Sequence, residues 1–126
     1  MIDLKQEILT ALRSDPGLAS VLGKDTSGKV KVYPETSPEA VADPYITFFE
    51  LTNFDKSFAD NIALKSEIHF QVDVWSKSNT SPIALHANRV MESLGFYRSG
   101  AADQFENATR TYHKVLRYKT TQLLGG

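Results

Sequence analysis

The chain begins with two segments whose apolar residues repeat at helical spacing. Residues 4–12 place leucine, isoleucine and alanine three or four positions apart, which lines one face of a helix. Asp15 and Pro16 then predict the cap and first turn of a short second helix, which Gly23 ends. The polar run 24–29 that follows predicts a loop.

Two extended segments follow that loop. Residues 30–33 predict a brief strand that Pro34 ends, because proline removes a donor from the ladder. Residues 45–52 are rich in aromatic and β-branched side chains and contain no glycine or proline, which predicts a second strand. We expect a loop at 35–43, and a polar turn at 53–61.

The segment 64–76 alternates strictly between apolar and polar side chains. This pattern predicts a strand of an antiparallel sheet that packs one face on a core and turns the other to water. At the usual rise per residue the segment would span about 43 Å, twice the typical strand. We therefore expect it to bend at a bulge or to extend as a ribbon past the core. The apolar side consists of Leu64, Ile68, Phe70, Val72 and Val74.

The remaining residues predict one more helix and two more extended segments. Ser81 and Pro82 predict the cap and the first turn of a helix that Gly95 ends. Residues 96–99 predict a short strand, and residues 100–107 a turn. In the last segment, 108–120, neither alternating side is wholly apolar, so we expect an exposed edge strand protected by basic residues.

This order of elements predicts an α+β fold, with a mainly antiparallel twisted sheet of about four to five strands and helices packed on one face. The 126 residues fit one domain, residues 1–126, because a single core usually organises about 100 to 150 residues. With 41% hydrophobic and 23% charged residues, the composition is that of a globular protein rather than a disordered one.

Charge and cysteine content exclude several functional classes. The formal net charge of −1 argues against a dedicated nucleic-acid-binding protein held by phosphate contacts. We expect no signal peptide and no membrane association, because no apolar run approaches the roughly 18 residues of a membrane span. The chain has no cysteine, which excludes disulfides, iron–sulfur clusters and thiol nucleophiles.

The charges are divided unevenly between the two halves of the chain. Residues 1–60 carry 6 basic and 10 acidic side chains, whereas residues 61–126 carry 8 basic and 5 acidic ones. Such a division suits subunits that meet head to tail and close a ring. The alternative is solvated surface charge without a partner.

No catalytic motif occurs in the sequence, and no nucleotide-binding or calcium-binding motif does. Glu67, His69, Asp73 and His113 are residue types that bind divalent metals. Successive same-side residues of a strand stand about 7 Å apart and diverge, so we interpret them as a polar face. His86 is expected at the boundary between core and surface. The sequence therefore points to no metal and no cofactor.

Six residues are candidates for contacts with other molecules. The basic and aromatic residues of the last segment fit DNA, a protein partner or a solvated edge. The aromatic rings among the candidates stand where polar side chains are expected, and such rings exclude water when a partner docks. The tryptophan has the alternative of folding back on its own core. The candidates are Phe54, Phe58, Trp75, Arg110, Arg117 and Tyr118.

Three stretches carry a family resemblance: the helix 4–12 leading into 18–22, the segment 32–46 with its proline loop, and residues 70–76 followed by the helix that ends near Leu94. On these stretches the chain resembles the small tail-completion proteins of long-tailed bacteriophages, also called tail-terminator or tail-to-head joining proteins. The likeness runs from Leu4 to Tyr118. It marks fold positions, so no functional residue is carried over.

The resemblance implies a non-enzymatic virion protein whose subunits assemble into a ring, commonly sixfold, that caps the tail tube. It implies that the partners are further copies of the chain, the tail-tube protein and the head-connector protein, with direct DNA contact and membranes disfavoured. The implied location is the tail or head–tail interface of the virion, after synthesis in a bacterial host or from a prophage.

A rival function from a different class is a small α+β ligand-binding module or an enzyme of unknown substrate. That function requires a deep apolar cavity lined by converging polar groups.

Overall fold

The computed structural model of the chain describes residues 1–38 and 41–124, which form one five-stranded sheet and three helices. The sheet order is β1-β2-β3-β5-β4; β1 pairs with β2 in parallel, and the other neighbours pair antiparallel. The predicted α+β class with a mainly antiparallel sheet is confirmed. In chain order the elements are α1 (Lys5–Ser14), α2 (Pro16–Leu22), β1 (Val32–Pro34), β2 (Tyr45–Ala59), β3 (Ile62–Ser76), α3 (Ser81–Ser93), β4 (Tyr97–Glu106) and β5 (Thr111–Leu123).

Local capping chemistry fixes where the short helices begin and end. The Asp15 carboxylate accepts a hydrogen bond from the Leu18 backbone N–H at 2.9 Å, and Gly23 ends α2 with a φ of 72°, as the sequence predicts. The start of α3 differs from the expectation. Ser81 is the first helical residue rather than the cap, and its backbone N–H donates to Asn79 Oδ1 at 3.0 Å. Among the described residues, no helix is long and apolar enough to cross a membrane.

One hydrophobic core joins the three helices to the sheet. Ile8 and Leu12 of α1 are fully buried against the sheet cluster, together with side chains of α2 and α3. Phe70 links two other aromatic rings of this core. The centroid of its ring lies 6.3 Å from that of Phe48 and 5.9 Å from that of Phe96, which it meets edge-on. Full burial of such a side chain stabilises a fold by about 1.5–3 kcal/mol. The alternation predicted for β3 is confirmed: its buried apolar positions are Ile68, Phe70, Val72 and Val74.

The prediction of an edge strand at the end of the chain is wrong. Strand β5 lies between β3 and β4, so both of its edges are hydrogen-bonded. The edge position belongs to β4, whose side chains are almost all exposed and which covers the expected turn at 100–107. The small residues of that segment carry no strand signal of their own. Pairing with β5 supplies the backbone hydrogen bonds that hold it extended.

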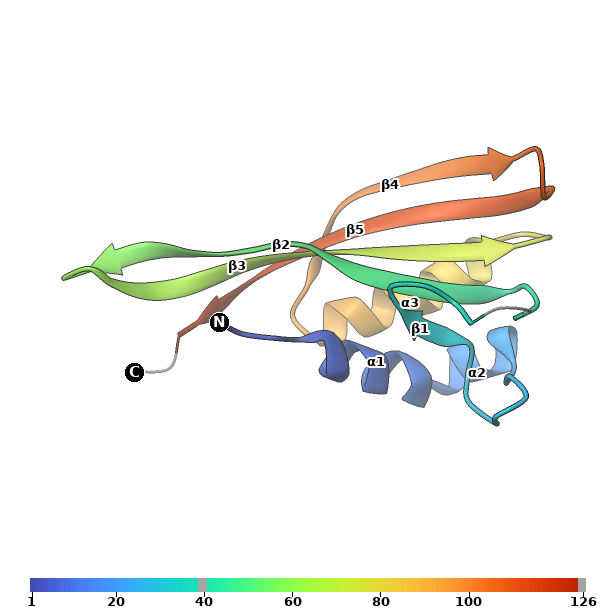
Figure 1. Cartoon of the computed structure of the whole chain (residues 1–126), viewed down its shortest axis with the longest axis horizontal. Helices are drawn as coiled ribbons and strands as arrows, with labels where there is room; N and C mark the ends of the chain where they lie inside the picture. Colours follow the sequence, from blue (N-terminus) through green and yellow to red (C-terminus); the bar gives the residue numbers. More distant parts are fainter. Residues whose placement is uncertain (39–40, 125–126) are drawn as a thin grey trace.

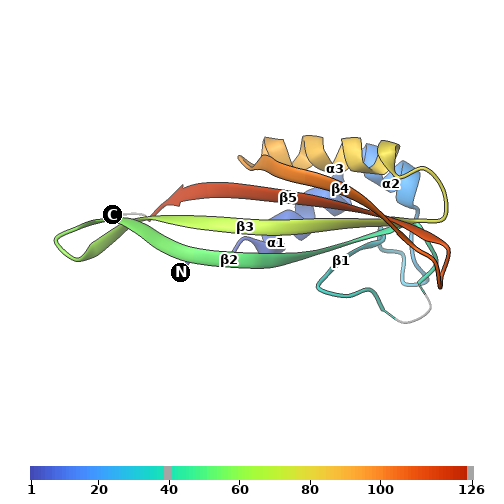
Figure 2. The ribbon, with the colours of Figure 1, turned by 90° about the horizontal axis from the view of Figure 1, so that it is seen from above.

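The turn expected at residues 53–61 is also wrong. Strand β2 continues to Ala59, and the connection to β3 shrinks to Asp60 and Asn61, both at positive φ (51° and 62°), as in a type I′ hairpin turn. A bulge between Glu50 and Thr52 shifts the register. Figures 1 and 2 show the β2–β3 ribbon extending beyond the helices, which matches the expectation for the long strand.

Gly17 of α2 lies directly against the ring of His86 in α3. A Cβ atom built on Gly17 would stand 2.4 Å from His86 Nδ1 and 2.5 Å from Cε1. The histidine ring is partly buried, so its predicted boundary position is confirmed. The close approach of the α2 backbone to the His86 ring therefore requires glycine at position 17, because any Cβ atom there would collide with the ring.

We expect Gly17→Ala to lower the free energy of unfolding by about 1–3 kcal/mol, because the new methyl group forces α2 away from α3. Denaturant unfolding measures this change. Gly100→Ala is the matched control: nothing lies within 4 Å of its Cβ position, and we expect a change within about 0.5 kcal/mol. In a His86→Ala background most of the cost of Gly17→Ala should disappear; an undiminished cost there would show that the ring is not the obstacle.

Candidate interaction surfaces

The most prominent surface feature is the part of the β2–β3 ribbon that extends past the core, residues 51–66, which we call the arm (Figure 1). Phe58 is 62% exposed and Ile62 67% exposed, and Leu51, Phe54 and Leu64 are exposed as well. Single exposed apolar side chains are ordinary on protein surfaces, but clusters of them mark contact sites. The arm is therefore the leading candidate for a protein interface.

The apolar residues of the arm lie on both of its faces. Phe54 pairs across the ribbon with Glu67, and Phe58 with Ala63, so the two phenylalanines share one face. Ile62 and Leu64 occupy the other face, because side chains alternate along a strand. That second face continues the apolar side of β3 that packs on the helices within the core.

Polar contacts hold the base of the arm in shape. Lys56 Nζ donates to Glu67 Oε1 at 2.7 Å, His69 Nε2 lies 2.8 Å from Glu67 Oε2, and the His69 ring stacks with Phe54. The hydrogen bond from Lys56, followed by that from His69, lowers the pKa of Glu67 from 4.5 to about 2. On the opposite face, Ser66 donates to Asp55 Oδ1 at 2.7 Å.

Trp75 lies on the sheet face opposite the buried side chains of β3, in a row of stacked rings. Its ring stacks on His113 at 3.7 Å and on Tyr45 at 6.2 Å, and its Nε1 donates to Thr47 Oγ1 at 3.0 Å. His113 Nε2 in turn lies 2.7 Å from Asp73 Oδ1. Trp75 thus packs on its own sheet, and one side of the row remains accessible.

The basic residues of the last segment do not form one patch. Arg117 lies on the Trp75 face, where its Nε donates to Gln71 Oε1 at 3.2 Å. Lys114 points to the opposite face and forms an ion pair with Asp103 at 3.2 Å. Arg110 sits in the β4–β5 turn at a φ of 56°, 5.1 Å above the Phe105 ring. Since β5 is an internal strand, the interpretation of these residues as a solvated edge is wrong.

Tyr118 is placed in the core. Its side chain is 0% exposed, and its hydroxyl donates to Asn88 Oδ1 at 2.8 Å. Burial raises the pKa of this hydroxyl well above its ordinary value. The residue therefore has no surface available to a partner and is left out of the interface proposed below.

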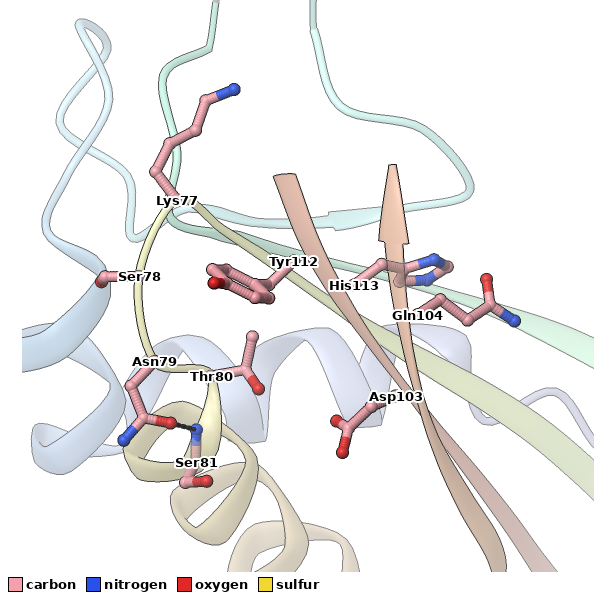
Figure 3. A pocket seen from close by; sticks show the side chains of 9 residues that line it. All are labelled: Lys77, Ser78, Asn79, Thr80, Ser81, Asp103, Gln104, Tyr112 and His113. Atoms are coloured by element: carbon pink, nitrogen blue, oxygen red, sulfur yellow. Dashed lines mark hydrogen bonds between the residues drawn. The ribbon is translucent and has the colours of Figure 1, made fainter. Parts of the chain in front are cut away.

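A polar pocket of about 560 Å³ opens beside the first residues of α3 (Figure 3). Asp103 of β4 points into it toward Thr80 and Ser81 (Figure 3), and Gln104 of β4 and Tyr112 and His113 of β5 also line it. Mainly polar side chains surround this space, in contrast to the apolar cavity that the rival function requires. Within the described residues, no three metal-binding side chains converge.

Several surface residues escaped the sequence analysis. Ile62, Leu64 and Leu123 are exposed near or on the arm, and Leu85 is exposed on α3. Leu64 belongs to the segment whose alternation predicts burial, so that prediction is wrong for Leu64, which lies beyond the helices (Figure 1). The pair Asp60-Asn61 was an available signal, because these residue types favour the type I′ turn that makes a ribbon out of residues 53–61.

Residues 6–123 match the model of the family described as Tail completion protein gp17. The fold is similar to that of a chain in the structure "Virion of native gene transfer agent (GTA) particle", with a TM-score of 0.65 and 15% sequence identity. That similarity covers 94% of this chain and 92% of the other, and at this identity it concerns the fold. A comparison with curated proteins gives no match.

We expect Lys56→Met to raise the pKa of Glu67 towards 4.5, because the first of its two hydrogen-bond donors is lost. In the unchanged protein, this lowered pKa contributes stability that is present above about pH 4.5 and is lost as the pH falls towards 2. NMR titration of the Glu67 carboxyl carbon measures the shift. Lys65→Met, which removes a neighbouring charge without removing a hydrogen bond, is the control; an equal shift in both variants would contradict the assignment.

Proposed function

Because this chain belongs to the Tail completion protein gp17 family, we propose that it is a non-enzymatic subunit that closes the end of a phage tail. Membership in the family places it in the tail region of the virion, as the resemblance implied. We propose further that copies assemble into a ring, commonly sixfold, that caps the tail tube and presents a surface to the head connector. A tail-terminator works through matching surfaces and requires no shifted titratable group.

The observation that carries this proposal is the arm. An apolar ribbon that extends from a well-packed core exposes surface that water solvates poorly, and a protein partner would remove this surface from water. Each 100 Å² of apolar area buried there contributes about 2.5 kcal/mol before the costs of association. The exposed rings of Phe54 and Phe58 have the character of interface anchors.

A second surface is available for the further partners. We infer that the three helices cover one face of the sheet, because their buried side chains join one cluster with the apolar side of β3. The opposite face carries the stacked row of Tyr45, Trp75 and His113, with Arg117 beside it. A tail-tube or head-connector protein can lie against this face while the arm contacts another molecule.

We expect Phe58→Ser to leave the fold intact and to reduce incorporation into particles strongly. The ring is exposed, so its loss costs little in the isolated chain, whereas an interface anchor contributes about 2 kcal/mol or more on docking. The measurement is the amount of protein in purified tails, quantified against the major tail protein. Thermal unfolding of the purified variant confirms that the fold is kept.

Phe58→Leu is the matched control, because it keeps an apolar side chain at the same position. We expect tails to contain it at close to the normal level. If tails contained Phe58→Ser at the normal level, Phe58 and the arm face around it would not be part of the interface. Absence of the unchanged protein from tails, in electron microscopy of labelled particles, would overturn the proposed function itself.

A further inference from the structure

We propose that the arm of one copy docks into a groove between α3 and β4 of a second copy. This inference rests on the proposed function of a self-assembling subunit, and it names the two surfaces that meet. The groove has a volume of about 250 Å³ and lies on the side of the sheet that carries α3.

The groove combines an apolar floor with a basic rim. Its floor is formed by Ala84 and Leu85 of α3, Ala101 of β4 and Leu116 of β5. Leu85 is 65% exposed, although it lies on the helix that covers the core. The groove is thus an apolar surface for which the described part of the chain provides no cover.

The face of the arm that carries Ile62 and Leu64 matches this floor in chemistry. Within the core, the same side of β3 belongs to one hydrophobic cluster with buried side chains of α3, and Phe70 and Val72 are part of that cluster. Beyond the core no helix of the same copy is present (Figure 1). Helix α3 of a second copy would therefore cover the exposed part of this side of β3 with apolar side chains, as helices do within the core.

An acidic side chain on the arm and a basic side chain beside the groove both lack an ion pair in the described part of the chain. The arm carries Asp60 at its turn, and Asp60 forms no ion pair among the described residues. The groove is bordered by Arg98, whose Nη1 donates to Asn88 Oδ1 at 3.4 Å and which forms no ion pair among the described residues, and by Lys114, which is paired with Asp103. Arg89 lies one helical turn from Leu85 and also forms no ion pair in the described part of the chain. Complementary charge favours this pairing over unrelated ones.

Charge complementarity extends over the two sides of the sheet. Residues 1–60 form β1, β2, α1 and α2, and they carry the acidic excess; residues 61–126 form the β3–β5–β4 side with α3, and they carry the basic excess. The β2 strand of the arm, with Asp60 at its end, belongs to the first side, whereas the β3 strand of the arm and the groove belong to the second. A contact between the arm and the groove joins different surfaces of two copies, which is the head-to-tail type that closes rings.

The absence of cysteine from the chain makes a direct test possible. Ile62→Cys and Leu85→Cys are prepared as separate variants, mixed and treated with a short bismaleimide reagent, both as concentrated protein and in purified tails. We expect a cross-linked dimer from the mixture. We also expect a ladder of multimers from the doubly substituted chain, ending at the ring size. Ile62→Cys mixed with Thr26→Cys, in the exposed loop after α2, is the control that should not cross-link.

A charge exchange tests the rim independently. Asp60→Arg should raise the concentration for half-assembly by about tenfold, and Arg98→Glu should do the same, because each places like charges together. The two variants mixed, or the double variant, should recover most of the loss. Both side chains are exposed, so we expect normal unfolding curves for each variant.

The outcomes separate this inference from the proposed function. The inference would be overturned if rings or tails assembled but gave no cross-link between positions 62 and 85, and if Asp60→Arg did not change their assembly. The proposed function would then remain in place. Arm variants that release the tail-tube protein but leave rings intact would assign the arm to that protein instead. A chain that neither assembles nor enters particles would overturn both.

Discussion

The structure depends on a difference in length between strands and helices. A strand rises about 3.3 Å per residue and a helix about 1.5 Å, so the 15 residues of β2 and of β3 each span about 50 Å, whereas the 13 residues of α3 span about 20 Å. No helix of this chain can cover the whole ribbon. The apolar side of β3 is therefore buried where helices lie on it and exposed where they end, and the arm is the direct consequence.

The face of the sheet that carries Trp75 is held in order by contacts among its own side chains. Its side chains cover one another: Trp75 lies on His113, His113 contacts Asp73, and Trp75 donates to Thr47. Asp73 is only 4% exposed as a result. Because these polar groups have partners, the side chains of this face hold one another in place. In the proposed assembly, one partner meets this ordered surface and another meets the arm at the end of the molecule.

Local chemistry made much of this fold predictable. The caps of α2, the alternation in β3 and the excess length of that strand follow from residues close in sequence, and the structure contains them. Position within the sheet does not follow from local pattern: β5 carries basic side chains on both faces, yet it lies between β3 and β4. Tyr118 shows the same limit, because its burial depends on α3 and on Asn88, thirty residues away. Of the predicted interface residues, Phe54 and Phe58 lie on the arm because a two-residue turn extends β2.

An isolated two-stranded ribbon is only marginally stable in water, so an arm that acts in assembly needs support before it docks. Here the type I′ turn sets the register, the Lys56–Glu67–His69 contacts brace one face, and the end of β5 pairs with Lys65 and Ser66 at its base. Each contact reduces the conformational freedom that docking would otherwise have to remove. In the proposed assembly, the polar residues of the arm preorganise the ribbon, and its apolar residues provide the affinity. This division explains why a segment polar enough to predict a turn can form an interface.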